Sequence, residues 1–95
     1  MAKEPCVYIM SNAGHTVLYT GVTADIARRI HEHRVGIGSA FTRKYRVIKL
    51  VYVEFFPTMT QAIAAEKSIK GGSRAKKVAL IDAQNPMWND LAEYF

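Results

Sequence analysis

Two short runs of β-branched and aromatic residues constrain the fold of this chain more than any other feature. Residues 6–10 read CVYIM, residues 17–22 read VLYTGV, and the six polar or small residues between them, SNAGHT, include a glycine. Such a pattern predicts an antiparallel hairpin. If the hairpin pairs symmetrically about its loop, Tyr8 lies directly across from Tyr19 on one face, with Cβ atoms about 5 Å apart. The two hydroxyl groups could then act on one substrate atom, although paired tyrosines also pack together for purely structural reasons.

One further strand and several helices are expected after the hairpin. Residues 48–56 form a third apolar run that Pro57 ends, and residues 35–46 read as a loop or broken helix. Start and stop signals predict three helices: from an N-cap at Thr23 to about Arg34, from Thr58 or Thr60 to Lys70, and from an N-cap at Ser73 to about Ala83. The sequence therefore predicts a single domain, residues 1–95, of the α+β class, with a small, three-stranded, mostly antiparallel sheet flanked by helices.

Charge and composition restrict the classes of function. The chain has 13 lysines and arginines against 8 acidic residues, a net charge of +5. This excess is typical of small domains that bind a phosphate-rich partner, although many basic proteins bind nothing anionic. A lone cysteine, Cys6, excludes an internal disulfide and a four-cysteine zinc site. No apolar run could span a bilayer and the N-terminal MAKEP lacks a signal core, so a cytoplasmic location without membrane contact is expected.

The first predicted helix directs two polar side chains toward the sheet. At about 100° per residue, Arg29 and His33 lie one turn apart along the edge of the apolar stripe of Ile26 and Ile30. The residues expected to point away from the sheet are Arg28, His31 and Glu32. An arginine at a core-facing edge needs an anion, either a carboxylate or a phosphate. A histidine one turn further, aimed at the same tyrosine pair, makes this group a candidate site.

Glu66 is the most unusual single residue. On its predicted helix it projects between the apolar residues Met59, Ala62, Ile63 and Ile69. A carboxylate in an apolar stripe is costly unless it is paired, protonated or bound to a metal. An ion pair with Arg29 or a lysine would be the structural explanation. The chemical explanation is Mg²⁺, which keeps most of its waters and binds through one or two carboxylates.

These residues, in this order, resemble the GIY-YIG nuclease superfamily. The first motif corresponds to CVY at residues 6–8, which keeps the tyrosine and loses a glycine, and the second to YTG at residues 19–21, which keeps both ends. The family's late asparagine falls within PMWN at residues 86–89. The likeness extends over nearly the whole chain and is greatest to the short, stand-alone bacterial members. By this resemblance the catalytic set is Tyr8, Tyr19, Arg29, His33, Glu66 and Asn89.

The resemblance implies a metal-dependent endonuclease that hydrolyses phosphodiester bonds in DNA, with structured or branched DNA among its substrates and DNA repair among its roles. Mg²⁺ or Mn²⁺ on Glu66 would polarise the phosphate, and Arg29 would neutralise the charge that develops there. Tyr8 would be the general base, with Tyr19 and His33 hydrogen-bonded around it. Since the ordinary pKa of a tyrosine is about 10, nearby positive charges would have to assist Tyr8. Asn89 would position the substrate.

Basic and aromatic residues in two segments are expected to hold nucleic acid, DNA more readily than RNA. They are Phe41, Arg43, Lys44, Tyr45, Lys70, Arg74, Lys76 and Lys77. The cations would contact phosphates, and Phe41 or Tyr45 would stack on a base. A protein partner could supply specificity to so small a domain. Two other interpretations stay open: a nucleic-acid-binding or accessory protein with weak or no hydrolysis, and an interaction domain in which Glu66 and Arg29 form a plain ion pair.

Overall fold

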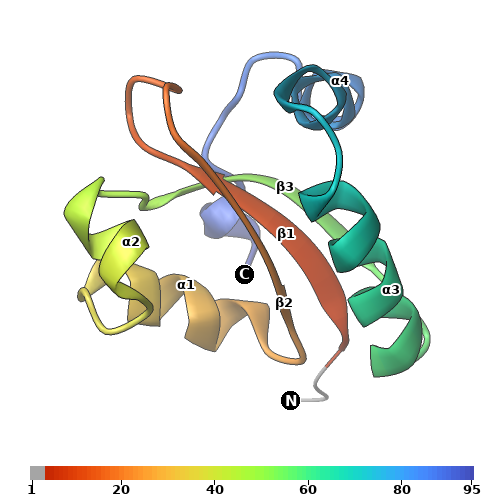
Figure 1. Ribbon diagram of the computed structural model, residues 1–95. Coiled ribbons are helices and arrows are strands. Elements are labelled where there is room, and N and C mark those ends of the chain that lie inside the picture. The colour runs from red at the N-terminus through yellow and green to blue at the C-terminus, as the bar shows by residue number, and fades with distance from the viewer. Residues whose placement is uncertain (1–3) are drawn as a thin grey trace.

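The computed structural model describes residues 4–95 and confirms the α+β architecture (Figure 1). The sheet is antiparallel, has the strand order β2-β1-β3, and consists of β1 (Cys6–Ser11), β2 (Leu18–Thr23) and β3 (Lys49–Phe55). All six side chains of the central strand β1 are buried, because a strand lies on each side of it and helices cover both faces. Residues 1–3, part of the N-terminal stretch judged to lack a signal core, lie outside the described residues.

Helices follow both edge strands. They are α1 (Ile26–Arg34), α2 (Ala40–Lys44), α3 (Met59–Lys70) and α4 (Arg74–Gln84), with a 3₁₀ turn at Leu91–Tyr94. The expected N-cap Ser73 is confirmed, since its side chain accepts a hydrogen bond from the backbone N–H of Lys76. The prediction that Thr23 caps α1 is wrong. Asp25 is the cap, because its carboxylate accepts from the N–H of Arg28, while Thr23 accepts from the N–H of Asp25 one step earlier.

The hairpin register differs from the symmetric expectation by two residues. Tyr8 pairs with Gly21 and Tyr19 pairs with Met10, so the two tyrosines are not directly opposed as predicted. The cause is Asn12, which closes the loop by accepting hydrogen bonds on its side chain at 2.9 and 3.0 Å from two backbone N–H groups near the start of β2. Because side chains alternate along a strand, a shift of two keeps Tyr8 and Tyr19 on one face as diagonal neighbours.

The sheet separates two hydrophobic cores. On one face, the core contains Cys6, Tyr8, Met10, Ile26, Ile30, Val47 and Leu50. On the other face, it contains Ile9, Val51, Tyr52 and Ile81, with Ile69 and Leu80 packed against them. Helix α1 therefore lies on the Tyr8 face, and α3 and α4 lie on the Ile9 face, in agreement with the opposite placement of α1 and α3 in Figure 1. Within residues 4–95, no helix has the length and apolarity that crossing a membrane requires.

Candidate active site

Three aromatic side chains meet on the face that α1 covers. Tyr8 Oη lies 3.1 Å from His33 Nε2, and the ring centroids of Tyr8 and Tyr19 are 6.3 Å apart. The rings of Tyr19 and His33 meet edge to face, with centroids 5.4 Å apart. Tyr8 and His33 are almost fully buried, at 2% and 3% exposure, whereas Tyr19 is half-buried and reaches the surface. The group therefore has an enclosed hydrogen-bonded pair and an open tyrosine beside it.

Gly21 makes room for Tyr8. A Cβ atom at position 21 would lie 2.4 Å from Tyr8 Oη and 2.5 Å from its ring carbon Cζ. The phenol thus lies close against the backbone of its pairing partner on β2, which restricts where the hydroxyl can point. The glycine of the second motif is required by this close approach, since no larger residue fits beneath the ring.

We expect Gly21→Ala to displace the Tyr8 hydroxyl from His33 and to lower the free energy of unfolding by about 1–3 kcal/mol, the usual cost of overpacking. Urea unfolding measures the stability, and the imidazole nitrogen shifts of His33 report the lost hydrogen bond. Gly14→Ala is the matched control, because nothing lies within 4 Å of a Cβ at that position. Equal stabilities and unchanged His33 shifts in the two variants would contradict this account of Gly21.

A hydrogen-bond network defines the tautomer of His33. Its Nδ1 lies 3.1 Å from Thr42 Oγ1, and the Thr42 hydroxyl donates to the carbonyl oxygen of Ser39 at 3.2 Å. Since the Thr42 hydrogen is used in that bond, Thr42 Oγ1 accepts from His33 Nδ1–H. The lone pair of Nε2 is then free to accept the Tyr8 hydrogen. Gly38 packs directly against the imidazole, because a Cβ at that position would lie 2.6 Å from His33 Nδ1.

Burial moves the pKa values of the pair in opposite directions. Burial, reinforced by the neighbouring Tyr19, raises the pKa of Tyr8 well above its ordinary value near 10, and the positive charge of Arg29 only partly opposes this. Burial, followed by the charge of Arg29, lowers the pKa of His33 below its ordinary value of 6.5. In neutral solution the phenol therefore keeps its proton and the imidazole is uncharged. This is the donor and acceptor arrangement that the hydrogen bonds require.

The lowered pKa of His33 predicts a stability loss in acid. The unfolded chain takes up a proton at this residue below about pH 6.5, before the folded protein does, so the free energy of unfolding should fall as the pH drops below that value. Above it, the contribution of His33 to stability is complete. Urea unfolding between about pH 8 and 5 should show this slope, and His33→Gln should flatten it.

The matched control for that pH series is His15→Gln. Partial burial, followed by the charge of Lys49, also lowers the pKa of His15, but this residue lies near the surface. We expect the slope of this variant to stay closer to that of the unchanged protein. A slope that disappears in His15→Gln and survives in His33→Gln would contradict the assignment.

Arg29 forms one ion pair and leaves one buried nitrogen without a partner. Its Nη1 lies 3.4 Å from Glu32 Oε1, but its Nε is buried without a hydrogen-bond partner. Among residues 4–95, the only other such buried side-chain atom is Thr20 Oγ1. A small polar hollow of about 160 Å³ adjoins Arg29 and is lined in part by Thr23, Asp25 and Glu32. An unpartnered guanidinium N–H beside a polar hollow suits an additional anionic ligand.

The structure corrects one expectation about Arg29 and decides one open alternative: of the two partners considered for Glu66, Arg29 or a lysine, it has the lysine. Glu32 was expected to point away from the sheet, but it is half-buried and bridges Arg28 and Arg29. Arg29 does not pair with Glu66. The partner of Glu66 is Lys70, whose Nζ lies 3.2 Å from Glu66 Oε2 one turn along α3. The interpretation that Glu66 and Arg29 form a structural ion pair is therefore excluded.

Glu66 lies on the inner side of α3. Its side chain is 14% exposed, and its neighbours Ala62 and Ile69 face the sheet, but Ile63 is 38% exposed, so the apolar stripe is narrower than expected. Helix α3 packs on β1 and β2 from the Ile9 face, whereas Tyr8, Tyr19 and His33 gather on the opposite face. In residues 4–95, no hydrogen bond or ion pair joins Glu66 to that aromatic group.

Asn89 has a structural neighbour that the sequence analysis missed. The buried Asn85 accepts from the backbone N–H of Asn89 at 3.1 Å and donates to the Asn89 carbonyl oxygen at 2.9 Å. Its amide also donates to the carbonyl oxygen of Val51 at 3.1 Å. Asn85 thus fixes the turn after α4 on β3, while the side chain of Asn89 is exposed and free to contact a substrate.

The side chains of this region offer few ligands to a metal ion. In residues 4–95 there is no group of three or more His, Cys, Asp or Glu side chains that could enclose an ion. A transition metal held by protein ligands alone does not fit this set. A single half-buried carboxylate such as Glu66 does fit Mg²⁺, which commonly takes one protein carboxylate, several waters and substrate oxygens.

The eight expected nucleic-acid contacts fall in two groups. Phe41, Arg43, Lys44 and Tyr45 lie on or just after α2, and the ring centroid of Phe41 is 6.3 Å from that of Tyr19. The second group lies where α3 meets α4. There Arg74 donates to the carbonyl oxygen of His15, Lys77 donates to the carbonyl oxygen of Gly72, and Lys70 pairs with Glu66. Lys76 is exposed.

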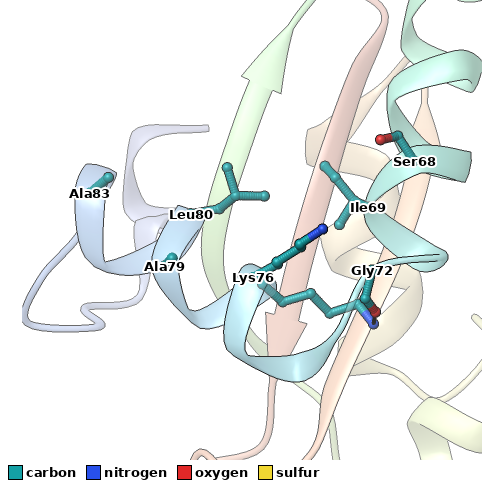
Figure 2. A pocket seen from close by; sticks show the side chains of 8 residues that line it. Ser68, Ile69, Gly72, Lys76, Ala79, Leu80 and Ala83 are labelled. Atoms are coloured by element: carbon teal, nitrogen blue, oxygen red, sulfur yellow. Dashed lines mark hydrogen bonds between the residues drawn. The ribbon is translucent and has the colours of Figure 1, made fainter.

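A cavity of about 390 Å³ lies between α3 and α4. Figure 2 shows Ile69 and Leu80 facing it from the two helices, with the Lys76 side chain along one side. Its other lining residues are Ser68, Gly72, Lys77, Ala79 and Ala83. None of the six expected catalytic residues lines it, so the chemistry indicated by the sequence lies elsewhere.

The structural roles of five residues were missed by the sequence analysis. Gly21, Gly38, Ser39 and Thr42 support the aromatic group, and Glu32 pairs with Arg29. One local signal for part of this network was present. Ser39 caps α2 by accepting from the N–H of Thr42, and serine is a preferred residue at the N-cap of a helix. The contact of Thr42 with His33 could not have been predicted from this signal, because it joins two helices.

Comparison with known proteins assigns the chain to a protein family. Residues 4–79 match the model of the GIY-YIG catalytic domain, and this chain belongs to the GIY-YIG family, a family of nucleases. It is similar to a UPF0213 protein of Natronomonas pharaonis, with 42% identity over 81 residues that cover 85% of this chain and 94% of the relative. A UPF0213 protein of Syntrophus aciditrophicus is 41% identical over 81 residues, which cover 84% and 91%.

The fold has also been observed in a relative. The solution NMR structure of a UPF0213 protein from Bacillus halodurans superposes with a TM-score of 0.59 at 32% identity, and the match covers 92% of each chain. These relatives are of nearly the same length as this chain, so the resemblance to short, stand-alone members is confirmed. These comparisons assign the chain to a nuclease family. Its substrate and metal ion are inferred below from the chemistry of the site.

Proposed function

We propose that this protein is a metal-dependent endonuclease that hydrolyses phosphodiester bonds in DNA. The observation that carries the proposal is the hydrogen-bonded chain of Tyr8, His33 and Thr42 next to the unpartnered Nε of Arg29. A protonated phenol, a neutral imidazole and a free cationic donor are the groups that hydrolysis of a phosphodiester needs for proton transfer and charge neutralisation. Membership of the GIY-YIG family and the net charge of +5 support the same function.

Tyr8 and His33 act together as the base. Because the pKa of Tyr8 is raised, a free phenolate is disfavoured. The attacking water instead gives its proton to Tyr8 Oη as the Tyr8 proton moves to His33 Nε2, so full negative charge never rests on the phenol. Thr42 holds Nδ1–H of the imidazole and keeps Nε2 available throughout. Tyr19, which is half-buried and reaches the surface, hydrogen-bonds to the water or the phosphate.

Arg29 binds the scissile phosphate through Nε and neutralises the charge that grows on it. Mg²⁺ or Mn²⁺ held by Glu66 would polarise the phosphate and stabilise the leaving oxygen. Helices α1 and α3 lie on opposite faces of the sheet and β2 is an edge strand. A phosphate that both Arg29 and Glu66 reach must therefore lie across the outer edge of β2, close to Tyr19. Asn89 and the cations of α4 hold the flanking strand.

The test is a panel of end-labelled DNA and RNA substrates, including duplex, single-stranded and branched forms, incubated with Mg²⁺, Mn²⁺ or EDTA. We expect cleavage of DNA with either metal ion and none in EDTA. Cleavage that persists in EDTA would contradict the metal dependence. Salt-sensitive binding without cleavage under any condition would identify the protein as a nucleic-acid-binding or accessory member of the family and overturn the proposal.

A further inference from the structure

A row of aromatic rings runs outward from the candidate active site onto the surface. It begins at His33 and continues through Tyr19 and Phe41 to Tyr45, with successive centroid distances of 5.4, 6.3 and 5.0 Å. Its last two members are unusually open for their size, at 45% exposure for Phe41 and 41% for Tyr45. We call the surface formed by Phe41, Lys44 and Tyr45 the α2 platform.

The chain segment that carries the α2 platform is basic, and among residues 4–95 only one of its cations, Arg34, forms an ion pair with an acidic residue, Asp90. Between Glu32 and Glu54 the chain contains no acidic residue and has five lysines or arginines, namely Arg34, Arg43, Lys44, Arg46 and Lys49. Lys44 Nζ lies 5.2 Å from the centroid of the Tyr45 ring, so a cation and a ring face form one unit. Exposed rings surrounded by cations suit a ligand that has both flat π-faces and negative charges, which is the chemistry of a nucleotide chain.

Only an unpaired base can use such a surface. In a continuous duplex each base face is covered by the next base pair, and a protein reaches base edges and phosphates alone. Ring faces of aromatic side chains stack on bases that are splayed out or single-stranded. Because the platform is continuous with Tyr19, the base that it takes belongs to a nucleotide next to the phosphate being cleaved.

We propose that the α2 platform binds an unpaired nucleotide beside the scissile phosphate, so that the substrates of this protein are single-stranded segments or the unpaired nucleotides of structured DNA. The inference rests on the proposed nuclease function for its position relative to the cleaved bond. Helix α2 links the two events, since Phe41 takes the base and the adjacent Thr42 holds His33.

The experiment measures binding in EDTA, where no cleavage is expected, by fluorescence anisotropy of an end-labelled single strand and of the duplex with the same sequence. We expect the single strand to bind more tightly. Phe41→Leu and Tyr45→Leu, which keep apolar volume and remove the ring, should each weaken single-strand binding about tenfold and change duplex binding less than twofold. Phe95→Leu is the matched control, because Phe95 is 42% exposed and stacks on Phe55 instead.

A second readout uses a fluorescent adenine analogue whose emission is quenched by stacking. Quenching on binding to the unchanged protein and its loss in Phe41→Leu would support the platform. The platform would be overturned if Phe41→Leu and Tyr45→Leu weakened binding of duplex and single strand equally, or weakened neither. The platform would equally be excluded if the two variants abolished self-association in sedimentation and left binding to nucleic acid unchanged.

Failure of the platform and failure of the nuclease function give different results. If the protein cleaves DNA with Mg²⁺ but binds duplex and single strand with equal affinity in EDTA, only the platform proposal is wrong. If the protein binds single strands through Phe41 and Tyr45 but cleaves no substrate with any metal ion, the platform is supported as a binding surface and the proposed nuclease function is wrong.

Discussion

Replacing Glu66 by glutamine should reduce divalent-dependent cleavage by about a hundredfold or more and leave the fold intact. In the proposed mechanism a metal ion on Glu66 would contribute several kcal/mol to stabilisation of the transition state, and the neutral glutamine amide would bind that ion much more weakly than the carboxylate. The cost to folding is small, because the bond lost from the folded state is an ion pair with Lys70, whose side chain is 53% exposed, and such pairs contribute about 0.5 kcal/mol. Cleavage of a labelled single strand and thermal melting measure the two effects.

Lys70→Gln is the matched control for Glu66. It breaks the same ion pair but keeps the carboxylate, so cleavage at saturating DNA should persist, with at most the weaker binding expected from the loss of one phosphate contact. Any stabilisation by Mg²⁺ should be lost only in Glu66→Gln. Binding of DNA by Glu66→Gln should stay the same or tighten, since a negative charge near the phosphate is gone. A large drop in the melting temperature without metal, with unchanged cleavage per folded molecule, would show that Glu66 is structural.

Replacing Tyr8 by phenylalanine should lower the cleavage rate by about 10² to 10⁴, the usual contribution of a positioned acid or base. The phenylalanine ring still fits across Gly21, so the hairpin should keep its register. The buried Nε2 of His33 loses its donor, and the free energy of unfolding should fall by about 1–3 kcal/mol. Single-turnover cleavage and urea unfolding test the two expectations separately.

Tyr52→Phe is the comparison for Tyr8, because Tyr52 is also buried on the sheet and donates a hydrogen bond, to Glu54 at 2.8 Å, but lies in the core of the opposite face. It should lose some stability and no activity. If Tyr8→Phe behaved in the same way, with stability reduced and the cleavage rate kept, Tyr8 would be a packing residue and the proton relay through His33 would be wrong.

The strands and helices were predictable because their signals are local. Runs of β-branched and aromatic residues marked the strands, Ser73 marked the start of α4, and Pro57 marked the end of β3 within a few residues. The side of α1 that carries Arg29 and His33 also followed from helical geometry alone. The candidate site residues were identified by residue type and order, through the family resemblance.

The tertiary structure decided what depends on contacts between distant segments. The side chain of Asn12 set the hairpin register, which placed Tyr8 over Gly21 and left it diagonal to Tyr19. Packing of α2 on α1 supplied Thr42 as the partner of His33. Burial then raised the pKa of Tyr8, so the resting phenol keeps its proton and shares it with His33 Nε2. A sequence specifies which groups a strand or helix presents, but their protonation and partners follow from desolvation and neighbouring charges, which exist only once the chain has packed.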